Sequence, residues 1–451
     1  MAAIGINRVA LIFLATVAIT IPCFEAGVVN YDDFLLKQEE EARRAALEAY
    51  HPFPYNVTSE LNLHVHLALQ EHEKELKGMN ISTRRDLGSK KMPKGPCTAT
   101  NPIDRCWRCN PNWADDRFKL VSCAMGFGKK TTGGLGGPIY VVTDPSDDDM
   151  LNPKPGTLRH AVIQEGPLWI TFEHNMVIKL QQELLITSHK TIDGRGANVQ
   201  IKGGAGLSIF KVQNVIVHNI RIKSIKAASG GIIADSVNHQ GLRTRSDGDA
   251  ISIFTSSNIW IDHISMSDCE DGLVDIIAGS TGVTISNCHM THHNDVMLFG
   301  ANDQHTEDKI MQVTVAFNHF GQGLIQRMPR CRFGFVHVVN NDYTHWQMYA
   351  IGGSSAPTIL SQGNRFIAPM NDAAKLITHR DYAPESVWSK WQWRSEMDLL
   401  MNGAQFIESG EPLNGNYPGD RANIVEPKDG QFVTTITKYS GALSCKVGKP
   451  C

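Results

Sequence analysis

The chain has 451 residues, of which 42% are hydrophobic, so it can form one large domain or two medium ones. Its 43 Lys and Arg against 46 Asp and Glu give a net charge of −3, so the basic excess typical of a nucleic-acid-binding protein is missing. An aromatic content of 8% argues against a disordered chain. We expect a folded protein with no nucleic-acid partner.

The first 26 residues have the pattern of a cleaved secretory signal. Arg8 supplies a positive charge, and an apolar run of thirteen residues, 9–21, follows it. This run is shorter than the ~20 residues that span a bilayer, although an uncleaved anchor is the alternative. No later segment is apolar enough for long enough to cross a membrane. We therefore expect residues 1–26 to be removed and the mature protein to be secreted, with no membrane partner.

Residues 27–100 differ in composition from the rest and predict an N-terminal extension. Residues 32–50 and, more weakly, 61–76 have helical periodicity, and residues 90–96 have the composition of a linker. Two N-x-S/T sequons, at Asn56 and Asn80, are candidate glycosylation sites. We expect this extension to be a pro-region or a clamp on the main domain, which spans residues 101–451.

Cysteine usage fits an oxidising compartment. Ten cysteines minus Cys23, which leaves with the signal, give nine, at positions 97, 106, 109, 123, 269, 288, 331, 445 and 451. Cys106 and Cys109 have a spacing that could serve zinc, but no second pair matches it, which favours disulfides. Because nine is an odd number, at least one thiol is free or paired elsewhere.

From about residue 139 the chain consists of short β-branched runs that each end in Asn or His. The closing positions are 219, 263, 287, 318, 341 and 364, and their intervals are 44, 24, 31, 23 and 23. One strand per repeat of about 23 residues, with no helix between, favours a solenoid over a sandwich. We expect an all-β fold, a right-handed single-stranded parallel β-helix (solenoid), with a partly helical N-terminal extension. The closing Asn residues would stack as an internal ladder of amides.

Four aspartates recur at the spacing of one coil: Asp247, Asp249, Asp271 and Asp275. Asp271 follows Asp247 by 24 residues and Asp249 by 22, which places them on neighbouring turns ~4.8 Å apart. Carboxylates this close repel one another unless a cation lies among them, and hard oxygen ligands in an irregular cage favour Ca²⁺. The alternative is solvated turn aspartates, because Asp-Gly is a common turn dipeptide. The one-turn register favours calcium.

Arginines lie beside this candidate calcium site. Counted from the closing residues, Asp271, Asp295 and Arg327 occupy adjacent turns of one face, and Arg330 and Arg332 follow. Acidic ligands, a hard cation and arginines along an open face suit a polymer that carries carboxylates. Arginines that merely lie on the surface, or that pair with the aspartates, remain an equal alternative.

Taken together, these residues resemble the secreted plant pectate lyases, a family that includes pollen allergens of conifers. The resemblance covers roughly residues 100–445 and rests on an ordered series of motifs: 101–107 (NPIDRCW), 193–196 (DGRG), 247–249 (DGD), 260–263 (WIDH), 271–275 (DGLVD), 279–281 (GST), 283–287 (VTISN), 326–330 (QRMPR) and 349–353 (YAIGG). Residues 27–100 resemble the N-terminal extension of part of that family.

The resemblance implies a parallel β-helix, a cell-wall location and calcium-dependent eliminative cleavage of α-1,4-galacturonan, with pectate (polygalacturonate) as the partner and a monomeric enzyme. It implies that the four aspartates hold Ca²⁺, that Arg327 is the base, and that Arg332 binds a substrate carboxylate. One position departs, since bacterial members have a substrate-binding lysine near Asn294 and Asp295. This change suggests a substrate-bridged calcium instead.

Two other functions stay open, a galacturonan hydrolase on the same fold and a non-catalytic wall-binding protein. The hydrolase would use carboxylates as acid and base, and would need no calcium. For the disulfides we expect Cys106 to pair with Cys123, which lies 17 residues later in the sequence.

Overall fold

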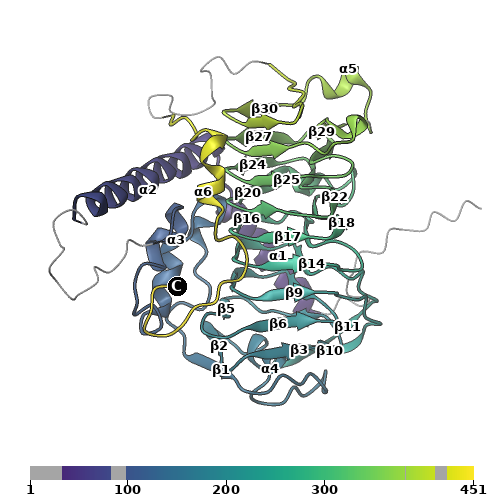
Figure 1. Ribbon diagram of the computed structural model, residues 1–451. Coiled ribbons are helices and arrows are strands. Elements are labelled where there is room, and N and C mark those ends of the chain that lie inside the picture. The colour runs from purple at the N-terminus through teal and green to yellow at the C-terminus, as the bar shows by residue number, and fades with distance from the viewer. Residues whose placement is uncertain (1–32, 83–97, 381, 412–423) are drawn as a thin grey trace, which may run out of the picture.

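The computed structural model describes residues 33–82, 98–380, 382–411 and 424–451, except for the side chains of residues 78–82. Its coils stack into one long solenoid, with β1 and β2 at one end and β30 at the other (Figure 1). Three parallel sheets of ten, nine and eight strands run along this solenoid, which is the predicted parallel β-helix. The expected signal (1–26) and linker (90–96), together with Cys97, lie outside the described residues.

Each coil contributes one short strand to each long sheet. The ten-stranded sheet consists of β1 (Ile139–Val142), β2 (Leu168–Phe172), β5 (Lys190–Asp193), β8 (Gln213–His218), β13 (Ser257–Asp262), β16 (Thr281–Ser286), β20 (Gln312–Ala316), β24 (Phe335–Val339), β27 (Thr358–Gln362) and β30 (Trp393–Glu396). The nine-stranded sheet consists of β3 (Met176–Ile178), β6 (Val199–Lys202), β9 (Arg221–Lys223), β14 (Ser265–Ser267), β17 (His289–Thr291), β21 (His319–Phe320), β25 (Asp342–Thr344), β28 (Arg365–Ile367) and β31 (Leu399–Met401). The eight-stranded sheet consists of β4 (Leu184–Leu185), β7 (Leu207–Phe210), β12 (Ile251–Phe254), β15 (Val274–Ile277), β19 (Met297–Phe299), β23 (Arg330–Arg332), β26 (Ile351–Ser354) and β29 (Thr378–His379).

Smaller elements occupy the connections between coils. Two small sheets pair β10 (Gly231–Ser236) with β11 (His239–Arg243) and β18 (His293–Asp295) with β22 (Leu324–Gln326). The short helices are α3 (Pro102–Trp107), α4 (Leu158–Val162), α5 (Glu385–Trp388) and α6 (Val433–Ile436), with 3₁₀ turns η1 (Arg117–Cys123), η2 (Gly126–Lys130), η3 (Thr306–Ile310), η4 (Asp372–Ala374) and η6 (Gly430–Phe432). The hairpin β10–β11 accounts for the long 44-residue interval between closing positions 219 and 263.

The core of the coil is built from like residues stacked in register. Ile261 pairs with Val217 on one side and with Ile285 on the other, and all three side chains are fully buried. Aromatic rings stack in the same way, for example Tyr343 on Phe320 at 4.5 Å between ring centroids. Because neighbouring coils repeat the same spacing, apolar side chains of equal size meet at each level and leave few voids.

The predicted amide ladder forms at only half of the closing positions. Asn318 donates from its side-chain amide to Asn341 Oδ1 at 2.9 Å, and Asn341 donates to Asn364 Oδ1 at 3.0 Å. Each also accepts the backbone N–H of the preceding coil, as in the bond from Cys288 N to Asn318 Oδ1 at 2.8 Å. Asp398 continues the ladder by accepting from Asn364 at 3.1 Å.

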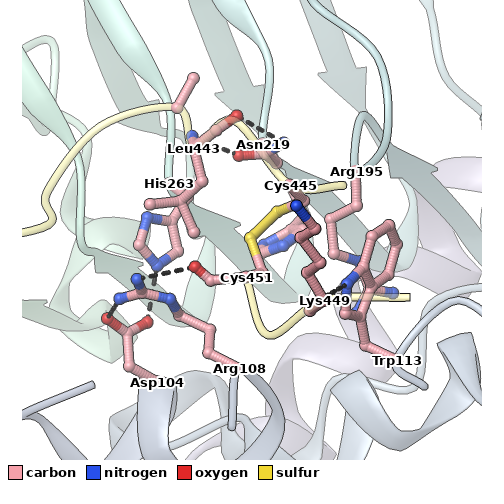
Figure 2. The surroundings of a disulfide bond; sticks show 12 residues. Asp104, Arg108, Trp113, Arg195, Asn219, His263, Leu443, Cys445, Lys449 and Cys451 are labelled. Carbon is pink, nitrogen blue, oxygen red and sulfur yellow. Dashed lines mark hydrogen bonds and ion pairs between the residues drawn. A yellow bond between two sulfur atoms is a disulfide. The ribbon is translucent and has the colours of Figure 1, made fainter. Parts of the chain in front are cut away.

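The ladder prediction was wrong for positions 219, 263 and 287, which are one residue out of register. Asn219, His263 and Asn287 themselves adopt left-handed backbone conformations, with φ of 60°, 55° and 51°. In the ladder coils the left-handed residue is instead the one before the asparagine, as at Phe317 with φ of 60°. The side chains of Asn219 and His263 therefore bind the C-terminal segment: Asn219 Oδ1 accepts from Leu443 N–H at 2.6 Å (Figure 2).

The disulfides agree with an oxidising compartment. Cys106 pairs with Cys123, as predicted, and Cys445 pairs with Cys451 in the C-terminal segment (Figure 2). Cys109 is also disulfide-bonded, which removes the zinc alternative for the Cys106 and Cys109 pair. Three cysteines of the described part are free thiols, at positions 269, 288 and 331.

The N-terminal extension forms two helices that contact the coil. Helix α1 (Asp33–Ala49) matches its prediction, and α2 (Pro54–Ser82) is longer than the predicted 61–76, beginning at a proline, which suits a helix start. Glu39 of α1 forms a 2.6 Å ion pair with the fully buried Lys211. The sequon residue Asn56 is exposed, whereas the Asn80 side chain lies outside the described residues. No helix in the described part of the chain is both long enough and apolar enough to cross a bilayer.

Candidate active site

Three of the four predicted metal ligands meet on the outer side of the eight-stranded sheet. One carboxylate oxygen from each of Asp247, Asp249 and Asp271 lies within 4.8 Å of the other two. Residues 247 and 249 shortly precede β12, and residue 271 shortly precedes β15. Strands β12 and β15 are neighbours, and Ile251 pairs with Val274 at their start. The one-turn spacing predicted from the sequence therefore brings these carboxylates together.

Asp249 is held rigidly at the centre of this cluster. Its Oδ1 accepts the Gly272 N–H at 2.6 Å, and its Oδ2 accepts the Ser252 hydroxyl at 2.8 Å. Gly272 has no room for a side chain, because a Cβ there would lie 2.6 Å from Asp275 Oδ1 and 2.8 Å from Asp249 Oδ1. The same observation places the fourth predicted ligand, Asp275, beside Asp249.

The electrostatics of the cluster favour the binding of a cation. Burial, followed by the charges of Asp275, Asp247 and Asp271, raises the pKa of Asp249 well above its ordinary 3.8. Burial and the charges of Asp247 and Asp271 do the same for the pKa of Asp275, and Arg327 offsets them only in part. A set of hard oxygen donors at this density suits a divalent cation such as Ca²⁺.

Asp295 and Arg327 lie beside the cluster, on the two successive coils that follow it. Asp295 on β18 pairs with Gln326 on β22, and Arg327 Nε forms an ion pair with Asp295 Oδ1 at 2.9 Å. Arg327 lowers the pKa of Asp271, but burial and the charges of Asp247 and Asp295 outweigh it, so that pKa is raised. The predicted alignment of Asp271, Asp295 and Arg327 is therefore present in the structure.

Arg332 is more constrained than the sequence indicated. Its Nε donates to Asp303 Oδ1 at 2.8 Å and its Nη1 donates to the carbonyl of Gly300 at 2.6 Å. Its side chain is only 11% exposed, so little of the guanidinium is left for a ligand. Asn294, where bacterial relatives were expected to differ, donates to Asp295 Oδ2 at 3.1 Å and accepts from Gln326 at 3.2 Å.

Comparison with known proteins matches the chain to one family. The family model "Pectate lyase" matches residues 160–389, and the model "Pectate lyase, N terminus" matches residues 28–87. A pectate lyase of Lilium longiflorum is 56% identical over 98% of each chain, and probable pectate lyase 7 of Arabidopsis thaliana is 53% identical over 98% of each chain. The chain belongs to the pectate lyase family.

Solved structures agree with the fold of this pectate lyase family member. The crystal structure of the major allergen from cedar pollen is 46% identical and superposes with a TM-score of 0.73, covering 76% of this chain and 99% of the allergen. A thermostable pectate lyase at 20% identity has a TM-score of 0.52 over 70% of this chain and 95% of its own, which supports the fold alone.

Several residues that shape the site of this pectate lyase could not be predicted from its sequence. Ser252 and Gly272, which hold Asp249, carry no signal of their own, because a serine in a strand and a glycine after Asp are common. Asp303, the partner of Arg332, comes from the loop before η3 and was not linked to the arginine by any spacing. The three-residue separation of Asp249 and Ser252 at the start of one strand is the only local hint that the two side chains could meet.

Proposed function

We propose that this protein is a calcium-dependent pectate lyase, which cleaves α-1,4-linked galacturonan by elimination and leaves an unsaturated sugar end. The observation that carries the proposal is the meeting of three carboxylates within 4.8 Å beside the Arg327–Asp295 ion pair, in a chain of the pectate lyase family. The substrate class comes from that family and fits the site, because a polymer of carboxylates needs both a cation and arginines to bind an acidic surface.

Asp247, Asp249, Asp271 and Asp275 would hold the calcium. When bound there, the cation would neutralise the carboxylate of a galacturonate residue and make its C5 proton more acidic. The raised pKa values of Asp249 and Asp275 support this assignment, since these groups gain more from a cation than an ordinary solvated aspartate does.

Arg327, in its neutral guanidine form, would accept the C5 proton while the bond between C4 and the glycosidic oxygen breaks and that oxygen takes up a proton from water. Because the guanidine form is scarce below the ordinary guanidinium pKa of ~12, turnover should rise toward alkaline pH. The ion pair with Asp295 fixes the direction of the guanidinium and leaves the Arg327 side chain 27% exposed, so a substrate can reach it. Arg332, held by Asp303, would bind the substrate carboxylate.

The chain's N-terminal pattern and its disulfides support a secreted protein. We further propose that it acts on pectate in the plant cell wall as a monomer. The alternatives are a galacturonan hydrolase and a non-catalytic pectate-binding protein. The similarity to a pollen allergen keeps the second of these worth testing.

One experiment separates the three functions. Purified protein is incubated with polygalacturonate at alkaline pH, with calcium or with a chelator, and the ultraviolet absorbance of unsaturated product is recorded. A lyase gives absorbance only with calcium. New reducing ends without ultraviolet absorbance, and in chelator, would indicate the hydrolase, while neither signal together with binding would indicate a non-catalytic protein.

A further inference from the structure

Arg330 lies on the same face of the coil as the acidic cluster but farther along it. On the eight-stranded sheet, Arg330 of β23 is in register with Leu298 of β19, which is in register with Asp275 of β15. Residues in one register row of a parallel sheet point to the same side, and two strand spacings amount to about 10 Å. Arg330 is thus one of the outward-facing residues that continue the row of Asp275 toward β29.

Arg330 differs from its two neighbouring arginines in having no acidic partner among the described residues. Arg327 pairs with Asp295 at 2.9 Å and Arg332 pairs with Asp303 at 2.8 Å. The buried Nε of Arg330 lacks a hydrogen-bond partner in the described part of the chain. Burial, and then the charges of Arg332 and Arg327, lower the pKa of Arg330. A half-buried guanidinium without an acidic partner is stabilised by any anion that reaches it.

Aromatic rings hold the Arg330 guanidinium in place. The Tyr382 ring lies 4.3 Å from the Arg330 Cζ atom, and Tyr382 is 55% exposed. Behind them Tyr349 stacks on His379 at 4.6 Å and 9° between planes. A guanidinium stacked on a ring still presents its N–H groups in its own plane, where a carboxylate can accept from two of them.

The next position of the register row is a glycine, which makes room for this platform. Gly352 of β26 is in register with Arg330 on one side and with His379 of β29 on the other. A Cβ at Gly352 would lie 2.5 Å from Cε2 of the Tyr349 ring, so the ring occupies the place of a side chain. The row therefore runs from the acidic cluster to an arginine and then to a floor of aromatic rings, which suits a chain of uronic acid sugars.

We propose that Arg330, held by Tyr382, binds the carboxylate of a galacturonate residue at a subsite on the β29 side of the calcium cluster. This inference rests on the proposed function, since it assigns a further subsite for the same polymer. Arg330 is a positioning residue that favours de-esterified residues, because a methyl ester lacks the charge that pairs with the guanidinium.

The test compares Arg330→Gln with the unchanged protein in two assays. On polygalacturonate with calcium, KM should rise about tenfold, the effect of losing one hydrogen bond to a charged group, while kcat stays within about twofold. In electrophoresis through a gel that contains polygalacturonate and a chelator, retardation of the variant should weaken. On highly methyl-esterified pectin the variant and the unchanged protein should have closely similar KM values.

Two further variants serve as controls. Arg365→Gln removes an arginine of the nine-stranded sheet that is paired with Asp342 at 2.7 Å, and it should leave KM and retardation unchanged. Tyr382→Ala should raise KM about threefold, in keeping with the loss of an exposed cation–π contact. If Arg330→Gln fails to fold, as judged by its melting transition, Tyr382→Ala decides the question.

Unchanged KM and retardation in a folded Arg330→Gln protein would overturn the subsite while leaving the lyase function intact. A large fall in kcat with unchanged KM would overturn it as well, because it would move Arg330 into the chemical step. If the unchanged protein produces no unsaturated product, the proposed function fails instead, and the retardation assay then tests the subsite alone.

Discussion

Two buried aspartates, Asp104 and Asp249, experience opposite electrostatic surroundings. Under the C-terminal segment, Asp104 accepts from Arg108 Nη1 at 2.5 Å and from His263 Nε2 at 2.7 Å (Figure 2). The other His263 nitrogen, Nδ1, lies 2.9 Å from the carbonyl oxygen of Gly441, so both ring nitrogens face acceptors, which favours the cationic imidazole. Burial lowers the pKa of His263, but the charges of Asp104 and Asp262 outweigh it and raise that pKa. On the eight-stranded sheet, Asp249 faces hydrogen-bond donors and other aspartates.

The pKa values of the two groups move in opposite directions. Burial would raise the pKa of Asp104, but Arg108 and His263 outweigh it and hold that pKa at about 2. Burial and like charges together raise the pKa of Asp249 well above 3.8. Burial alone therefore does not separate structural from functional carboxylates. What separates them is whether the chain supplies the opposite charge beside them: Arg108 and His263 supply it for Asp104, whereas Asp249 faces further aspartates.

The largest effect that we expect comes from changing Arg327, which lies beside the acidic cluster. Arg327→Lys keeps the positive charge beside Asp295 but loses the planar fork and its reach, so turnover should fall by a factor on the order of 10² to 10⁴. Calcium and pectate binding should persist. Product formation and melting temperature are measured on one preparation.

The matched control is Arg365→Lys, which alters an arginine–aspartate pair on the nine-stranded sheet and should keep full turnover. Near-normal turnover in Arg327→Lys would rule out Arg327 as the base. A lowered melting temperature with preserved turnover would instead make it a structural arginine.

On the structural side of the comparison, Asp104→Asn should lower the free energy of unfolding by about 3–5 kcal/mol, because it leaves Arg108 and the His263 imidazolium buried without their counter-charge. Chemical denaturation in chelator measures this loss without a contribution from calcium. Asp115→Asn, at an exposed position nearby, should change stability by less than about 0.5 kcal/mol. Equal behaviour of the two variants would contradict the pairing argument.

The repeat and the acidic cluster could be predicted because both depend on spacing alone. A coil of fixed length places residues 22–24 apart on neighbouring turns, so the positions of Asp247, Asp249 and Asp271 along the chain are enough to bring them together. The ladder prediction failed at Asn219, His263 and Asn287 because these residues occupy the left-handed position, whereas a ladder asparagine is the residue after it. Both arrangements give the same spacing between coils, so the sequence does not distinguish them.

Contacts between distant loops could not be predicted in this way. The pairing of Arg332 with Asp303, and the covering of His263 by residues near Gly441, join segments whose separation carries no periodic signal. The helix α2 was underestimated because its first turns contain Asn56 and Thr58, which favour turns in isolation but here belong to a helix whose Thr58 is buried.

Calcium should stabilise the protein more as the pH rises. Groups whose folded pKa is raised, as for Asp249 and Asp275, contribute stability below about pH 3.8, and that stability is lost as the pH rises through the folded pKa. Asp104, with a lowered pKa, has the opposite slope and loses its contribution as the pH falls toward about 2. Calcium bound at the cluster would replace its protons and would add about 2.7 kcal/mol at a hundredfold excess over Kd.

Melting temperatures in calcium and in chelator, recorded from about pH 4 to about pH 8, test this expectation. The difference between the two series should be small at the acidic end and should widen toward neutrality. A difference that does not depend on pH would mean that the cation binds elsewhere than at the carboxylates with raised pKa values.

The smallest effect that we expect is the change in stability of Asp249→Asn, whose sign should depend on calcium. In Asp249→Asn the amide oxygen can still accept the Gly272 N–H and the new amide can donate to the Ser252 oxygen, so both hydrogen bonds survive while one of four crowded charges disappears. In chelator at neutral pH the variant should therefore be as stable as the unchanged protein or more stable by about 1 kcal/mol, in contrast to Asp104→Asn. With calcium the order should reverse, because the unchanged protein gains the cation and the variant binds it weakly. Denaturation of both proteins with and without calcium measures all four values. A variant that is destabilised in chelator and still gains fully from calcium would place Asp249 with the structural aspartates, and would move the metal site away from β12.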